Sequence, residues 1–139
     1  MKIKPDYDNA WYNRGLALYN LKQYEEAIAS FDQSLKIKPD YYEAWNYRGV
    51  ALGELGCYED AIASYDRALK LTSDYDSAYA YYNKACCYAL QGKIEQAVEN
   101  LKQAIDLNPS EIQKLAKTDS DFEIIREDKR FQALLVTDD

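Results

Sequence analysis

The residues best suited to covalent or metal chemistry are three cysteines, and their spacing supports neither. Cys57, Cys86 and Cys87 form no CxxC pair, and adjacent residues such as Cys86 and Cys87 point in different directions on a helix. The chain contains no histidine, which removes the Ser–His, Cys–His and histidine-ligated metal chemistries together. A sparse, odd set of cysteines is typical of free thiols in a reducing compartment. We therefore expect a cytoplasmic location, no metal and no cofactor.

The acidic residues and the charge balance also argue against catalysis and against anionic partners. Glu25-Glu26 and Glu59-Asp60 occupy one recurring position in the first turn of a predicted helix, where they suit the helix dipole and solvent. No P-loop, GxGxxG, HExxH, GxSxG or EF-hand pattern is present, so we predict that the protein is not an enzyme. The net charge of −7 repels phosphate backbones and anionic lipids, and no apolar run approaches a membrane span. We expect neither nucleic acid binding nor membrane insertion.

The elements that position these residues repeat along the chain. Tyr24 to Asp32 aligns with Tyr58 to Asp66, a period of 34 residues, and a third, more divergent copy follows. Such periods are typical of stacked supersecondary units. Within each copy the apolar residues recur three or four apart, which indicates two amphipathic helices. The predicted helices are 9–21, 24–37, 43–55, 58–71, 77–91 and 94–107.

The repeated positions resemble the tetratricopeptide repeat, and the match covers about three quarters of the chain. The family pattern is a large residue, a small one, an aromatic or leucine, alanine, an aromatic, alanine and proline. In sequence order those places hold Trp11, Gly15, Leu18, Ala27, Phe31, Ser34 and Pro39; then Trp45, Gly49, Leu52, Ala61, Tyr65, Ala68 and Ser73; then Tyr81, Ala85, Tyr88, Ala97, Leu101, Ala104 and Pro109. The first two copies also resemble bacterial, and specifically cyanobacterial, arrays.

This resemblance implies an all-α fold, a right-handed α-solenoid of three tetratricopeptide helix-turn-helix repeats with a C-terminal helical cap. A two-residue insertion near Ser73–Ser77 separates the second and third repeats. The predicted limits are 1–7 for the tail of a preceding repeat, 8–41, 42–75 and 78–111 for the repeats, and 112–139 for the capping helices.

The sequence also supports predictions about both ends of the chain. Residues 2–7 are identical to 36–41, so the chain opens on the tail of a repeat, and we expect a fragment of a longer array. An uncovered N-terminal edge would then allow a weak two-fold homodimer. In the last segment, Asp128 is placed to cap a short helix with Phe131, Leu134 and Leu135 on one face. The alternative for this segment is a regulatory tail.

One row of basic residues departs from the family pattern. Arg14, Arg48 and Lys84 stand where an apolar residue is more usual. We expect their stems to cover apolar surface while their charged ends pair with nearby carboxylates. The alternative is that the row binds an acidic ligand.

The resemblance implies a protein-binding function. In the family, the first helix of each repeat lines a concave groove that binds a peptide or protein segment. The positions that would contact the ligand are Asn9, Tyr12, Asn13, Leu16, Tyr19, Asn20, Glu43, Asn46, Tyr47, Val50, Glu54, Tyr79, Tyr82, Asn83 and Cys86. Asparagine pairs with peptide backbone, and tyrosine gives rigid contact area. The cationic clamp that holds chaperone C-termini in some members is missing. The alternatives are a structural assembly or oligomerisation module, and a regulatory segment of a larger multidomain protein.

Overall fold

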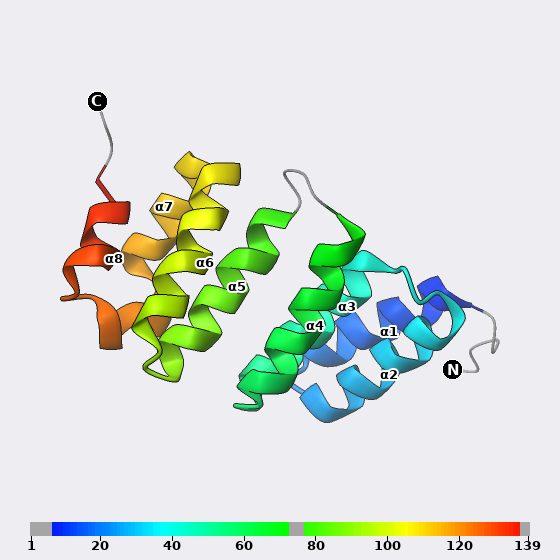
Figure 1. Ribbon diagram of the computed structural model, residues 1–139. Helices are drawn as coiled ribbons and strands as arrows, with labels where there is room; N and C mark the ends of the chain where they lie inside the picture. The colour runs from blue at the N-terminus through cyan, green and yellow to red at the C-terminus, as the bar shows by residue number, and fades with distance from the viewer. Residues whose placement is uncertain (1–6, 73–76, 137–139) are drawn as a thin grey trace. The chain divides into compact units, whose positions relative to one another are not determined.

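The computed structural model describes residues 7–72 and 77–136, and in these ranges it contains helices and no strand (Figure 1). Three stretches lie outside the described residues: 1–6, which is most of the predicted tail at 1–7; 73–76, which is most of the predicted insertion; and 137–139. The chain forms two compact units, Met1–Leu71 and Thr72–Asp139. The predicted all-α fold of helix pairs is confirmed.

The first unit contains two helix pairs. Its helices are α1 (Asp8–Asn20), α2 (Tyr24–Ile37), α3 (Tyr42–Glu54) and α4 (Tyr58–Leu71). Helix α1 packs on α2, α2 on α3, and α3 on α4. Each helix begins and ends within a residue of the predicted bounds, because the three- and four-residue apolar spacing and the intervening turns mark its limits directly.

A left-handed backbone residue follows the first helix of every pair. Gly56 and Gly92 have φ values of 78° and 74°, and Lys22 takes the equivalent place in the first pair with φ of 63°. Glycine adopts this conformation without steric cost, as expected for the two glycines. After the turn, the Cys57 amide donates to the Leu52 carbonyl at 2.9 Å. This bond closes the end of α3 before α4 begins.

A glycine and an aromatic ring make the tight contact inside each pair of the first unit. A Cβ atom on Gly15 would lie 2.5 Å from the Phe31 ring, and one on Gly49 would lie 2.6 Å from the Tyr65 ring. Phe31 is fully buried and Tyr65 nearly so. The missing side chain therefore lets the two helices approach closely while the ring fills the space around the contact.

The basic row joins helices through polar contacts. Arg48 donates from Nε to Asp32 Oδ1 at 2.7 Å and from Nη1 to Ser64 Oγ at 2.7 Å, so it ties α3 to α2 and to α4. Its guanidinium carbon lies 5.8 Å from the Trp45 ring centroid. Arg14 donates to Ser30 Oγ. The expected carboxylate partner is therefore found for Arg48, while Arg14 uses the equivalent serine.

The second unit contains one helix pair and the C-terminal segment. Its elements are α5 (Ser77–Leu90), α6 (Ile94–Leu107), α7 (Pro109–Thr118), the 3₁₀ helix η1 (Ser120–Ile125) and α8 (Lys129–Leu134). Helices α7 and α8 pack on α6, and η1 packs on α5. Asp128 caps α8 by accepting a hydrogen bond from the Arg130 amide at 2.8 Å, as predicted.

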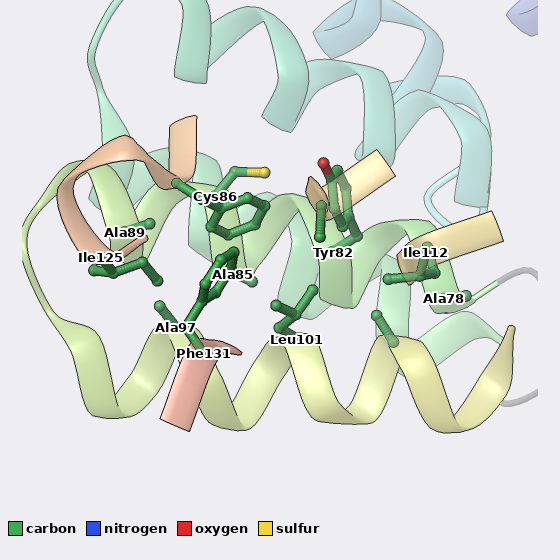
Figure 2. Close-up of a cluster of buried hydrophobic side chains, with 13 residues drawn as sticks. Ala78, Tyr82, Ala85, Cys86, Ala89, Ala97, Leu101, Ile112, Ile125 and Phe131 are labelled. Atoms are coloured by element: carbon green, nitrogen blue, oxygen red, sulfur yellow. The ribbon is translucent and has the colours of Figure 1, made fainter. Parts of the chain in front are cut away.

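The core of the second unit is shared between the helix pair and the C-terminal segment. Figure 2 shows Phe131 between Ala85 of α5 and Ala97 of α6, with Ile125 beside Ala89. Phe122 and Phe131 are fully buried, with ring centroids 5.2 Å apart. Leu134 and Leu135 pack at the edge of this cluster. The C-terminal segment thus covers apolar surface that the pair alone would leave open.

Candidate binding surface

Two rows of side chains lie along neighbouring helices of the first unit. Because residues at i, i+4, i+7 and i+11 share one side of a helix, each row faces a single direction. We call them together the α1/α3 face, and its residues are Asn9, Asn13, Leu16 and Asn20 on α1 and Glu43, Tyr47, Val50 and Glu54 on α3. No lysine or arginine belongs to it.

Aromatic contacts hold the two rows next to each other. The Tyr12 ring lies 4.8 Å from Tyr41 and 6.2 Å from Tyr47, measured between centroids, and Tyr19 lies 6.3 Å from Tyr47. The Tyr41 hydroxyl donates to Asn9 Oδ1 at 3.0 Å. Such ring pairs stabilise beyond their buried area, so α1 and α3 present a fixed surface.

The exposure of the predicted ligand-contacting positions follows the helix geometry. Asn9, Asn13, Asn20, Glu43, Glu54 and Tyr79 are exposed. Half-buried are Tyr12, Leu16, Tyr19, Asn46, Tyr47, Val50 and Asn83. Tyr12 and Tyr19 are half-buried because their rings pack between helices, so each offers a ligand only part of its surface. Among the positions predicted in the first unit, the asparagines of α1 and the glutamates of α3 are the most accessible.

Two positions of the third pair need correction. Tyr82 and Cys86 are 6% and 7% exposed, because η1 packs on this side of α5. The Phe122 ring of η1 lies 5.7 Å from that of Tyr82, and the Tyr82 hydroxyl donates to Asp119 Oδ2 at 2.5 Å. These two residues are therefore covered by the chain's own C-terminal segment and do not form an open surface.

Burial raises the pKa of several tyrosine and cysteine side chains near these surfaces. It is the main cause of the raised pKa of Tyr12 and Tyr19, with smaller contributions from Tyr47 at Tyr12 and from Glu54 at Tyr19. Burial also raises the pKa of Cys87 to about 12, and that of Cys86 well above its usual value. Both thiols therefore stay protonated at neutral pH, where only a thiolate would be an effective nucleophile.

One group of polar side chains in the second unit has the composition of a metal site. Ligand atoms of Cys86, Asp119 and Asp121 lie within 4.8 Å of one another. Asp119 Oδ2 accepts the Tyr82 hydroxyl, and Asp119 Oδ1 accepts the Asp121 amide at 2.9 Å. Because both carboxylate oxygens are used, the group anchors the start of η1 on α5.

Three residues that matter to these surfaces were missed by the sequence analysis. Asp32 pairs with Arg48, and its position could have been predicted, since an aspartate follows the aromatic residue at the same place in the first two copies (Asp32 and Asp66). Tyr41 supports the α1/α3 face from the turn before α3. Asp119 lies outside the repeats, so no periodic signal marks it.

Among the described residues, no helix is both long and apolar enough to cross a bilayer.

Comparison with known protein families agrees with the arrangement in helix pairs. Tetratricopeptide repeat models match residues 9–41 and 40–110. Searching curated proteins gave no match.

Several solved structures share the fold. The crystal structure of MamA protein superimposes with a TM-score of 0.71 at 21% identity, covering 84% of this chain and 60% of that one. The N-terminal domain of stress-induced protein-1 (STI-1) from C. elegans gives 0.73 at 18% identity, covering 91% and 100%. The Arabidopsis OM64 TPR domain gives 0.69 at 17% identity, covering 92% and 90%.

This chain therefore spans about three fifths of the MamA chain. At these identities the structures establish the shared fold alone. One family model by itself extends over 40–110, which is half of the chain. The chain belongs to the tetratricopeptide repeat family.

Proposed function

We propose that this protein is a non-catalytic interaction module that binds a peptide or protein segment on the α1/α3 face. Tetratricopeptide repeat folds are generally protein–protein interaction modules. The observation that carries the proposal is the combination of a fixed aromatic base with exposed carboxamides. Asn13 and Asn20 are exposed beside half-buried Leu16 and Tyr47, which gives backbone-pairing groups next to apolar contact area.

The proposed binding surface lies mainly on the first two repeats. The first two repeats, with the predicted limits 8–41 and 42–75, supply the proposed contacts. In the third, at 78–111, Tyr79 is exposed and Asn83 half-buried, whereas Tyr82 and Cys86 are covered. We therefore infer that the ligand contacts mainly α1 and α3.

A peptide-display selection on the whole chain tests this function. Segments that bind the wild-type chain should lose about tenfold or more in affinity when Asn13 and Asn20 are replaced by Ala, because two backbone-pairing groups are removed. Lys36→Ala, at an exposed position of α2, is the control and should leave affinity unchanged. Circular dichroism should show unaltered helicity in each variant. Equal binding by the double variant would contradict the proposed surface.

A separate observation, the exposure of small residues on α1, supports a second function: self-association through the outer side of this helix. Ala44 and Ala51 of α3 are fully buried, on the side where Arg48 meets Asp32 of α2. Their equivalents on α1 are more open, since Ala17 is exposed and Ala10 is half-buried. Leu21, directly after α1, is 67% exposed, against 40% for its counterpart Leu55.

The Trp11 indole in the same region also differs from its counterpart. Trp45 Nε1 donates to the Pro39 carbonyl at 2.8 Å. Trp11 Nε1 is buried without an acceptor in the described part of the chain, and the repeat equivalent of Pro39, Pro5, lies outside the described residues. A second copy could cover this side of α1, and we propose a weak two-fold dimer.

Sedimentation velocity at increasing concentration checks this prediction. The wild-type chain should shift toward dimer, and Ala17→Glu should stay monomeric because it places a charge in the contact. Ala63→Glu, at an exposed alanine of α4, should behave like wild type. A wild-type chain that remains monomeric at the highest concentration would rule out this interface.

The cysteines bear on the cellular compartment of the protein. Cys57, Cys86 and Cys87 are all free thiols. Free thiols, one of them exposed, suit a reducing compartment, and we infer a cytoplasmic location in a bacterial host.

A further inference from the structure

The charges of the α1/α3 face are confined to its two ends. Glu43 and Glu54 begin and end the row on α3, and both are exposed. They are eleven positions apart on the helix, which is about 16 Å along the axis. Between them lie half-buried Tyr47 and Val50, and the facing row on α1 is uncharged. The face is therefore apolar and amide-rich in the middle and negative at both ends.

A tyrosine ring accompanies each carboxylate. Burial is the main reason for the raised pKa of Tyr41 and Tyr19, and the acidic groups that add to it are Glu43 and then Asp8 at Tyr41, and Glu54 at Tyr19. A carboxylate and an aromatic ring each attract a cation, the carboxylate through its charge and the ring through its quadrupole. At the Glu43 end, Lys38 Nζ already lies 4.8 Å from the Tyr41 centroid, so a ligand cation there would pair with the exposed Glu43 carboxylate and not with that ring.

We propose that the α1/α3 face selects an extended, basic segment of a partner protein, with one cationic side chain near Glu43 and a second near Glu54. An extended chain advances about 3.3 Å per residue, so the two cationic residues stand about five positions apart. The asparagines of α1 pair with the backbone of the segment, and an apolar side chain between the cations contacts Leu16 and Val50. This inference rests on the proposed function and adds the chemistry of the ligand to it.

Three capped hexapeptide probes separate charge from shape. The first is Lys-Ser-Leu-Ala-Ser-Lys, and the others carry Gln or Glu in place of both lysines. Competition against a fluorescent form of the lysine probe, followed by anisotropy on the whole chain, should rank lysine first. We expect the Gln probe to bind about tenfold more weakly, the Glu probe more weakly still, and the lysine preference to shrink in high salt.

Variants of the chain assign the preference to the two carboxylates. Glu43→Gln with Glu54→Gln should bind the lysine and Gln probes alike, and Glu43→Lys with Glu54→Lys should prefer the Glu probe. The matched control is Glu59→Gln with Asp60→Asn, an exposed acidic pair at the start of α4, which should keep the wild-type ranking. Circular dichroism confirms that each variant is folded.

The outcomes distinguish this inference from the proposed function. Equal affinity of wild type for the lysine and Gln probes, a ranking that survives in the Glu43→Gln and Glu54→Gln variant, or no binding of the lysine probe would each overturn the basic-segment inference. If in those cases display-selected segments still lose affinity in the Asn13→Ala and Asn20→Ala variant, the proposed function stands without it. If they do not, both fall.

Discussion

Replacing Ile125 with alanine should lower the free energy of unfolding of the C-terminal segment by about 2–5 kcal/mol. Ile125 is 1% exposed and belongs to the core cluster that joins η1 to α5 and α6. The substitution removes buried methylene and methyl groups and leaves a cavity that the neighbouring rings fill only in part. Urea unfolding followed by circular dichroism measures the loss.

The adjacent isoleucine provides a matched control. Ile124 is 63% exposed, so Ile124→Ala removes the same atoms from solvent-facing surface and should change stability by less than about 0.5 kcal/mol. A thiol-reactive reagent gives an independent readout, because opening of η1 uncovers Cys86. Ile125→Ala should speed modification of Cys86, while exposed Cys57 reacts at the same rate in both variants. Equal effects of the two substitutions would contradict the described packing of η1.

The second large effect is expected at Gly49. A Cβ atom there would lie 2.6 Å from Tyr65 Cε1 and 2.8 Å from two further ring carbons. Because Tyr65 is almost fully buried, the ring cannot swing away without disturbing the contact between α3 and α4. Gly49→Ala should therefore cost about 1–3 kcal/mol through overpacking, even though alanine favours the helix. Thermal or urea unfolding of the whole chain measures this cost.

Gly53 in the same helix supplies the comparison. A Cβ atom at Gly53 meets no neighbouring atom within 4 Å, so only the backbone preference remains. Gly53→Ala should raise the free energy of unfolding by about 0.5–1 kcal/mol. Opposite signs for two identical substitutions four residues apart are the expected result. A stabilising Gly49→Ala would mean that α3 and α4 do not approach as described.

The helix pairs could be predicted because their information is local and repeated. The spacing of Gly15, Ala27 and Phe31 recurs as Gly49, Ala61 and Tyr65, so each copy supports the interpretation of the other. Asp128 could be identified as a helix cap because capping depends on one side chain and the amide two residues later. Positive φ at Lys22 was not predicted, since only its place in the repeat, and not its residue type, suggests a left-handed turn.

The candidate surface was only partly predictable. Positions on α1 and α3 follow from helical periodicity, and the structure shows the three predicted asparagines of α1 exposed and Asn46 of α3 half-buried. Tyr82 and Cys86 were misassigned because the family pattern presumes an open first helix in every repeat. Their burial depends on Phe122 and Asp119, which lie outside the repeats. Contacts of that kind arise from tertiary packing and leave no period in the sequence.

Backbone amide shifts of the whole isotope-labelled chain, recorded while a display-selected segment is added, test the central claim most directly. If the α1/α3 face is the binding surface, the largest shifts fall on Asn13, Leu16, Tyr47 and Val50. The contradicting result is an unchanged α1 and α3 with the largest shifts elsewhere. An example would be the hollow of about 520 Å³ on the second unit, lined by Glu95, Val98, Glu99, Lys102, Gln103, Asp106 and Arg130.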